Sequence, residues 1–226
     1  KAPTETEEGE EKRECENCDH FETREVAKLE PSNPSGTCGE NLTWVLDEEG
    51  TLTIKGSGAM DAVGFDSVTG QHLPPWKDWQ DHIKSVVIES GVTEIVDQAF
   101  GSCKNLETIV IPATVTKLGD FAFLYCPSLR DIQVDSGNQH YCTVDGVLYS
   151  KDMTTLIKYP ACRPGTEYTV PDTVTKLMHV AFDSASKLVS ITLPDNIIAL
   201  GTDTFADCTS LKNIRLPKNL IDMEAG

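Results

Sequence analysis

Basic residues are scarce in this 226-residue chain, which has 19 Lys and Arg against 36 Asp and Glu and a net charge of −17. A surface of this sign repels the phosphates of nucleic acids and anionic lipids, so neither is an expected partner. Long apolar runs are also missing, and none approaches the ~20 residues that a membrane helix needs. We therefore expect no direct insertion into a membrane.

Signatures of catalysis are missing as well. The sequence contains no GxSxG, HExxH, GxxxxGK[ST] or GxGxxG motif,. Its five histidines are scattered along the chain, and its acidic pairs lack the spacing of a calcium-binding loop,. We expect no enzyme, no catalytic residue, no metal site and no cofactor.

What the chain does contain is an internal repeat. The segment that begins at Ile109 and ends at Phe123 recurs with the same apolar spacing. Phe123 follows Phe100 by 123 − 100 = 23 residues, and Phe205 follows Phe182 by 205 − 182 = 23 residues. A fixed period of this length indicates a solenoid of stacked structural units.

Each repeat begins with a short predicted strand in which apolar residues alternate with polar ones. Such alternation places the apolar residues on one face of a strand. A proline often follows the strand and ends it, because proline has no N–H to donate. Two more apolar positions and a short helical turn ending in Phe complete the unit. One repeat alone buries too little apolar surface to offset the entropy of ordering it, so neighbouring repeats must stack.

The regular spacing is interrupted once. Val134 and Val170 are 36 residues apart, or 23 + 13, and the extra residues predict a hairpin inserted between 135 and 166. With Asp152 at the centre of the turn, Cys142 faces Cys162. Opposed strand positions are within reach of a disulfide, so we predict this bond.

The first 36 residues are acidic, rich in proline and poor in apolar residues, which predicts a flexible spacer,. Cys15, Cys18 and His20, together with Cys38, have a spacing that could supply zinc ligands. A local disulfide or free thiols in a mobile tail are the alternatives, because no second motif of this kind accompanies them.

Residues 37–82 predict a β-rich cap. Two strands, 42–46 and 51–54, flank an acidic turn that ends in Gly50, which is a hairpin pattern,. All three tryptophans, Trp44, Trp76 and Trp79, lie at or before the first repeat. We expect them to cover the open end of the stack, with a ligand platform as the alternative.

The repeats occupy residues 83–226, and the last one stops before its Ala-Phe pair. We expect a chain cut from a longer protein, with an exposed edge that favours an edge-mediated dimer. Cys103, Cys126 and Cys208 recur at one position of the repeat, and we predict buried structural thiols there.

The pattern Cys-x-x-Leu-x-x-Ile-x-Ile-Pro-x-x-Val-x-x-Leu-Gly-Asp-x-Ala-Phe, nearly complete in residues 103–123, resembles the BspA-like leucine-rich repeats of bacterial surface proteins. The resemblance implies a leucine-rich-repeat solenoid, a right-handed β-α superhelix of short strands and short helical turns behind a β-rich cap. It also implies an exported protein, extracellular or at the surface of a host-associated bacterium.

The outward strand residues are the candidate binding surface, because solenoid sheet faces commonly bind partners. We expect six adjacent strands to form one open sheet about 24 Å across. Its outward residues are Ser85, Val87, Thr108, Val110, Asp131, Gln133, Glu167, Thr169, Ser190, Thr192, Asn213 and Arg215.

The expected function is non-catalytic recognition or adhesion, with a host or bacterial surface protein or a glycan as the partner. A structural spacer within a longer surface protein is one alternative. An accessory binding domain of a secreted glycan-active enzyme is another.

Overall fold

The computed structural model describes residues 9–14, 21–26 and 33–223. The chain divides into two units, Lys1–Pro34 and Ser35–Gly226. Within the described part of the chain, no helix has the length and apolarity that a membrane span requires.

The first unit contains two paired strands. β1 (Gly9–Glu14) and β2 (Phe21–Val26) are antiparallel, with Gly9 opposite Val26 and Glu14 opposite Phe21. Nothing in the acidic composition of this segment predicts the pairing. Cys15, Cys18 and His20 of the proposed zinc or disulfide motif lie outside the described residues.

The second unit begins with the predicted cap. β3 (Ser35–Gly39), β4 (Leu42–Leu46) and β5 (Thr51–Gly56) form an antiparallel meander. The acidic turn between β4 and β5 is confirmed: the Asp47 carboxylate accepts the backbone N–H of Thr51 at 2.7 Å, and Gly50 supplies a φ of +90°,.

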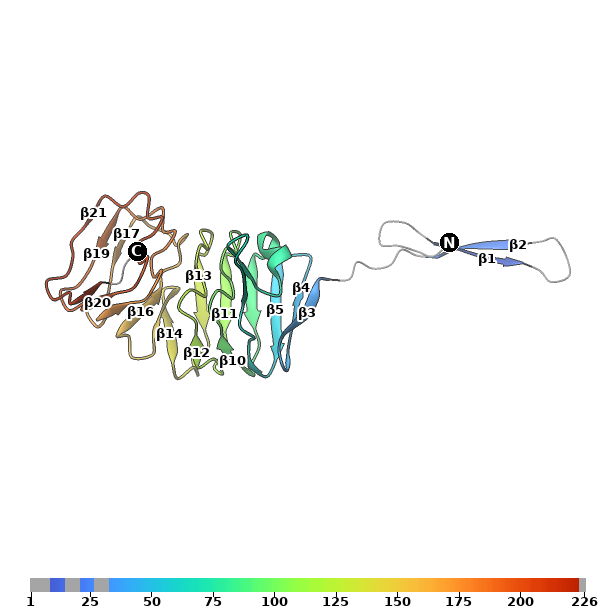
Figure 1. Cartoon of the computed structure of the whole chain (residues 1–226), viewed down its shortest axis with the longest axis horizontal. Coiled ribbons are helices and arrows are strands. Elements are labelled where there is room, and N and C mark those ends of the chain that lie inside the picture. The colour runs from blue at the N-terminus through green and yellow to red at the C-terminus, as the bar shows by residue number, and fades with distance from the viewer. Residues whose placement is uncertain (1–8, 15–20, 27–32, 224–226) are drawn as a thin grey trace. The chain divides into compact units, whose positions relative to one another are not determined.

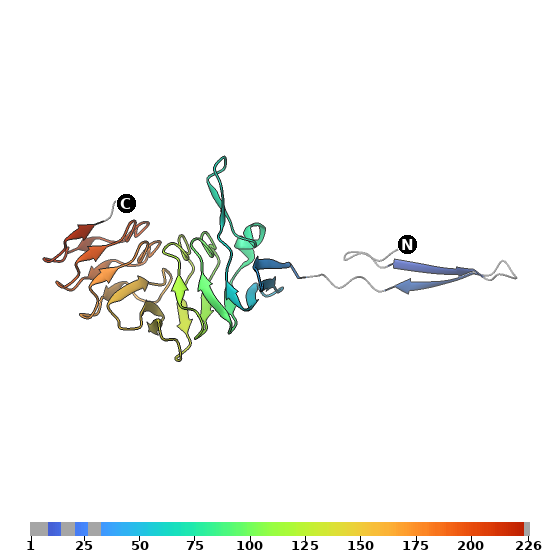
Figure 2. The ribbon, with the colours of Figure 1, turned by 60° about the horizontal axis from the view of Figure 1, so that its bottom comes forward.

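A second, smaller hairpin lies between the cap and the repeats. β6 (Gly58–Ala59) is followed by β7 (Gly64–Asp66) and β8 (Gln71–Leu73), which together form a two-stranded sheet. This β7–β8 hairpin projects from the stack (Figure 2). The 3-10 helix η1 (Lys77–His82) follows it.

The repeats form six turns, and each turn begins with a strand at the predicted place. These first strands are β9 (Ser85–Ile88), β11 (Thr108–Ile111), β13 (Asp131–Val134), β17 (Glu167–Thr169), β19 (Ser190–Thr192) and β21 (Asn213–Ile214). The strands on a second side of the coil are β10 (Val92–Ile95), β12 (Lys117–Leu118), β18 (Lys176–Leu177), β20 (Ala199–Leu200) and β22 (Asp222–Met223). Neighbouring turns pair in parallel, so the leucine-rich-repeat solenoid is confirmed (Figure 1).

The predicted helical turns are wrong. Among the described residues the only helix is η1. Tight turns take the place of the predicted helical turns, and they include Phe100, Phe123, Phe182 and Phe205. These rings stack from turn to turn: Phe100 lies 5.6 Å from Trp76 and 6.0 Å from Phe123, with nearly parallel planes. A ladder of aromatic rings therefore runs through the core.

The insert consists of three antiparallel strands where the sequence predicts a single hairpin. They are β14 (Tyr141–Val144), β15 (Val147–Ser150) and β16 (Thr155–Lys158). The additional reversal is the Asp145-Gly146 turn, in which both residues have positive φ, +50° and +79°, as a tight hairpin turn requires,.

This extra reversal makes the predicted disulfide wrong. Cys142 lies opposite Tyr149 on the neighbouring strand, and both Cys142 and Cys162 are free. The Cys142 sulfur contacts the Met153 sulfur at 3.5 Å, whereas the Cys162 sulfur accepts a hydrogen bond from Lys187 at 3.1 Å. The prediction assumed that one turn at Asp152 would bring the two cysteines together.

The insert also divides the predicted continuous sheet. The first sheet has the strand order β13-β11-β9-β5-β4-β3, and the second sheet has the order β17-β19-β21. The backbone N–H of Ile132 in β13 donates to the carbonyl of Gly146 at 3.3 Å. The β14–β15 turn therefore occupies the edge at which β17 would have paired.

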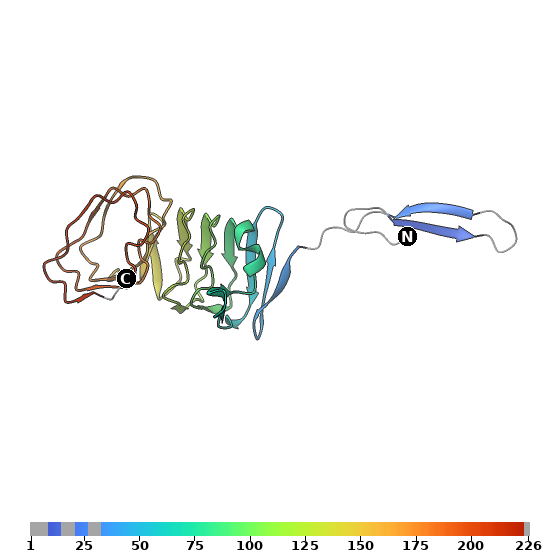
Figure 3. The same cartoon turned by 45° about the horizontal axis from the view of Figure 1, so that its top comes forward.

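The core is divided in the same way. One cluster of buried apolar residues lies inside the turns of β9, β11 and β13, and the other lies inside those of β17 and β19. β15 lies between them: Leu148 packs in the first cluster, and Val147 and Tyr149 pack in the second. The later turns are seen nearly end-on and the earlier turns edge-on in the same view (Figure 3).

Candidate functional site

The structure brings half of the predicted binding residues together on the first sheet. Parallel pairing aligns them in two rows across three strands. The rows are Ser85, Thr108 and Asp131, and Val87, Val110 and Gln133.

The cap extends both rows, which sequence reasoning missed. Thr51 of β5 pairs with Ser85, and Thr53 pairs with Val87 on one side and with Val45 of β4 on the other. The alternation of residues 42–54 could have revealed this extension, because it places the same residue types on the outward face. We call the outward residues of β4, β5, β9, β11 and β13 the first-sheet face.

The remaining predicted residues lie on a separate surface. Glu167, Ser190 and Asn213 are aligned across the second sheet, and Thr169 pairs with Thr192. Arg215 lies just beyond β21, where its guanidinium forms an ion pair with Asp195. A single binding face of twelve residues is therefore not formed.

The first-sheet face has little charge. Its central strands present Thr, Ser and Val, and the Ser85 hydroxyl donates to the Thr51 hydroxyl at 3.1 Å. The carboxylate in these rows belongs to Asp131 on the edge strand β13, and it accepts a hydrogen bond from the Gln133 amide at 2.8 Å. This composition contrasts with the net charge of −17 for the chain.

Two of the three tryptophans are buried at the start of the stack, as expected for residues that cover its open end. Trp44 and Trp76 are buried, with ring centroids 6.1 Å apart in an edge-to-face arrangement. Trp76 also donates from its indole nitrogen to the carbonyl of Ala99 at 3.0 Å and begins the aromatic ladder. Trp79 differs, since its side chain is exposed and packs beside His82.

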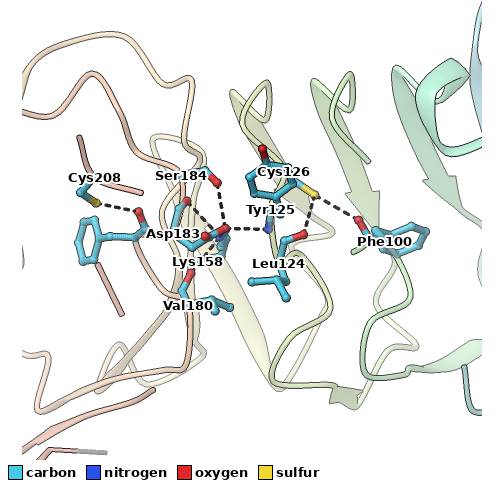
Figure 4. Close-up of polar contacts among 10 residues, drawn as sticks. Phe100, Leu124, Tyr125, Cys126, Lys158, Val180, Asp183, Ser184 and Cys208 are labelled. Atoms are coloured by element: carbon cyan, nitrogen blue, oxygen red, sulfur yellow. Dashed lines mark hydrogen bonds and ion pairs between the residues drawn. The ribbon is translucent and has the colours of Figure 1, made fainter. Parts of the chain in front are cut away.

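The repeat cysteines are free thiols packed within or beside the core. Cys103 and Cys126 are fully buried, as predicted, whereas Cys208 is only partly buried. The Cys126 sulfur donates to the carbonyl of Phe100, and the Cys208 sulfur donates to the carbonyl of Phe182, each at 3.2 Å (Figure 4). Burial raises the pKa of the Cys126 thiol to about 12, which keeps it protonated at neutral pH,.

A buried ion pair lies where the two groups of turns meet (Figure 4). The Lys158 ammonium is 3.6 Å from the Asp183 carboxylate and donates to the carbonyl of Val180 at 2.9 Å. Asp183 also accepts the backbone N–H of Tyr125 at 2.7 Å. Burial lowers the pKa of Lys158, and the nearby Asp183 charge opposes that shift,.

Sequence reasoning missed this pair, although a signal for it exists. Ala-Phe occurs at 99–100, 122–123 and 181–182, and the corresponding place in the third turn is Lys158-Tyr159, which is 36 residues after 122–123. Lys158 and Tyr159 lie within the predicted insert, 135–166, so the sequence prediction did not assign them to the repeat.

A depression of about 750 Å³ lies outside both sheets. Its walls come from the β7–β8 hairpin, from η1 and from the loops that close the first two turns. Within residues 33–223 and the two paired strands, no three His, Cys, Asp or Glu side chains are grouped as a metal ion would require.

Comparison with known proteins agrees with the repeat architecture. The family model for the BspA type leucine-rich repeat region matches six copies in residues 78–144 and 158–226. A search of the curated proteins finds no match.

Several solved structures are similar to this chain. A leucine-rich repeat protein from Eubacterium ventriosum is 22% identical, with 80% of this chain and 72% of that chain covered and a TM-score of 0.38. The pneumococcal vaccine antigen PcpA is 18% identical, with 84% and 71% covered and a TM-score of 0.48. A leucine-rich cell surface protein from Faecalibacterium prausnitzii is 19% identical, with 87% and 77% covered and a TM-score of 0.43.

The family match includes both groups of turns and omits the residues between them, 145–157, which fall within the three-stranded insert. This chain belongs to the family of BspA-type leucine-rich repeat proteins.

Proposed function

We propose that this chain is a non-catalytic recognition module of an exported bacterial surface protein, and that it binds a protein partner through the first-sheet face. Membership in a leucine-rich repeat family supports an interaction role, because such repeats present extended surfaces to partners,.

The observation that carries the proposal is a sheet face of Thr, Ser and Val on a strongly acidic protein. A partner that covers this face removes few charges from water, so little of the contact energy is lost to desolvation. The parallel register keeps the rows of Ser85 and Val87 straight across neighbouring strands. A flat partner surface therefore meets a regular array.

The test compares matched substitutions on the two sheets. Val110→Glu places a carboxylate at an exposed position of β11 within the first-sheet face, and Thr192→Glu places one at an exposed position of the second sheet. Binding to a panel of purified extracellular-matrix proteins and bacterial surface proteins is measured by biolayer interferometry. We expect Val110→Glu to weaken binding about tenfold or more, which corresponds to about 1.4 kcal/mol, and Thr192→Glu to leave it unchanged.

Circular dichroism on both variants checks that the fold is retained. Equal binding by the wild type and Val110→Glu would remove the first-sheet face as the contact surface. Export is tested separately, by asking whether protease added to intact cells that express the full-length gene degrades the repeats.

A further inference from the structure

The depression beside η1 lies on a third side of the coil and includes no residue of the first-sheet face. Gly70 and His72 line it from the hairpin, and Ser102 and Tyr125 line it from the loops of the first two turns. Its volume of about 750 Å³ is within the range of roughly 300–1,000 Å³ that is usual for small-ligand sites,.

The wall formed by η1 is held in place before any ligand arrives. The Gln80 side chain donates to the carbonyl of Gly101 at 2.6 Å, and the Asn105 side chain donates to the carbonyl of Asp81 at 2.7 Å. The indole of Trp76, directly before η1, is bound to the first turn as well. A preformed wall reduces the ordering entropy that a ligand must offset.

The formal charges around the depression cancel. Lys77 and Lys104 are matched by Asp78 and Asp81, and the Lys77 ammonium lies 3.4 Å from the Asp78 carboxylate. A phosphate or a cation would find no excess of opposite charge, so the lining favours a neutral ligand. Its amide, imidazole, carboxylate and hydroxyl groups offer both hydrogen-bond donors and acceptors.

One wall offers an apolar plane. Tyr125 is 42% exposed, and its backbone N–H is fixed by the carboxylate of the buried Asp183 at 2.7 Å. Its φ of +56° belongs to the repeat, because Ser184 and Asp207 have the same conformation at the matching positions. The ring and the polar lining together match a sugar, which has a face of C–H groups and a rim of hydroxyls.

We propose that this depression binds a short neutral oligosaccharide, with one sugar ring packed on Tyr125 and its hydroxyls hydrogen-bonded to the side chains of η1 and His72. This site is separate from the first-sheet face and does not depend on it. The chain would then have two recognition surfaces, one for a protein and one for a glycan.

The experiment is isothermal titration calorimetry of the full chain with four neutral probes: maltotriose, cellotriose, mannotriose and tri-N-acetylchitotriose. At least one is expected to bind with a Kd on the order of 1 mM or tighter. Trigalacturonate, an anionic probe, is expected to bind more weakly than the best neutral one, since the chain as a whole is acidic,.

Matched aromatic substitutions locate the site. Tyr125→Leu should weaken binding of the best probe about tenfold, and His72→Ala on the hairpin wall should weaken it severalfold. Trp79→Leu is the control, because Trp79 is similarly exposed (39%) and follows Asp78 in η1 but does not line the depression. Circular dichroism confirms that each variant is folded.

The proposal is overturned if no neutral probe gives saturable binding, or if Tyr125→Leu binds the best probe as tightly as the wild type. Tighter binding of the anionic probe would also overturn it. Val110→Glu on the first-sheet face should leave sugar binding unchanged, so failure of this site and failure of the protein-binding proposal are read out separately.

Discussion

Lys158 and Asp183 form an ion pair in which each side chain is only 2% exposed, at the junction between the two hydrophobic clusters. In a regular part of the stack, the backbone N–H of Ser102 donates to the carbonyl of Leu124 on the next turn. Tyr125, at the matching position one turn later, donates to the Asp183 carboxylate. The Asp183 carboxylate thus takes the place of the backbone carbonyl that accepts this hydrogen bond in the regular turn.

Removing one member of this pair should therefore be costly. Asp183→Ala leaves a buried ammonium and an unpaired backbone N–H, and we expect it to destabilise the fold by about 3–5 kcal/mol. The double variant Lys158→Met with Asp183→Asn keeps the side-chain volumes and an acceptor for Tyr125, so it should lose much less. Urea denaturation measures both, and equal losses would contradict this account.

Removal of the Tyr159 hydroxyl should stabilise the fold, whereas removal of the Asp183 carboxylate should destabilise it. Tyr159 takes the place of the repeat Phe and stacks on Phe182 at 5.2 Å. Its buried hydroxyl forms no hydrogen bond of standard geometry with the described residues, and the Arg163 guanidinium lies 5.9 Å from the ring centroid. Tyr159→Phe should raise the free energy of unfolding by about 1 kcal/mol, because no polar group is then left unpaired.

Tyr168→Phe is the matched control for that change. The Tyr168 hydroxyl is hydrogen-bonded to the Tyr149 hydroxyl, so its loss should destabilise the protein by about 1 kcal/mol,. Thermal denaturation measures both variants, and a drop in Tm for Tyr159→Phe would show that its hydroxyl has a stabilising partner.

The turn that divides the sheets depends on Gly146. A Cβ at this position would lie 2.7 Å from the Asp131 carboxylate, and its φ is +79°. Gly146→Ala should therefore cost about 1–3 kcal/mol. Gly70→Ala, at a φ of +70° with nothing within 4 Å of its Cβ, carries the backbone strain alone and should cost less. If chemical denaturation gives the two variants equal losses, the contact with Asp131 is unimportant.

Alkaline pH should weaken the fold through Cys126. Burial raises the pKa of its thiol from 9.0 to about 12, so above pH 9 the unfolded chain releases this proton while the folded chain keeps it. The stabilising contribution is complete below pH 9 and is lost as the pH rises from 9 towards 12. Between these values, stability should fall with a slope of up to about 1.4 kcal/mol per pH unit from this group.

Cys126→Ala removes that part of the slope at some cost in packing. Chemical denaturation at pH 8, 9, 10 and 11 compares the two proteins, with Cys142→Ala as a control at a less buried thiol. Parallel stability curves for the wild type and Cys126→Ala would show that the thiol does not titrate as expected.

The repeat could be predicted from sequence because its strands and core positions follow from patterns of nearby residues. Alternation around Ile109 and Ile111 placed a strand correctly, and the recurrence of Phe100 at Phe123 placed the core of each turn. These features depend only on residues close in sequence and on stacking of similar units.

The insert could not be predicted in the same way. Its register depends on where the chain reverses, and the chain reverses at Asp145-Gly146 as well as at the expected turn around Asp152. The break between the sheets followed from that one extra reversal, so the predicted twelve-residue face divided into two surfaces. The depression near Tyr125 combines residues of the β7–β8 hairpin, of η1 and of the loops of two turns, which no local pattern reveals.

The strand pairing of β13, β11 and β9 does not continue into β17, β19 and β21, because the insert of β14–β16 lies between the two sets of strands. One repeat unit of the later turns has 23 residues, the sequence spacing from Phe182 to Phe205. Duplication or loss of such a unit would change the number of later turns and leave the rows of Thr108 and Val110 on the first sheet as they are. The insert thus gives a repeat protein a point about which its two arms can evolve in length independently.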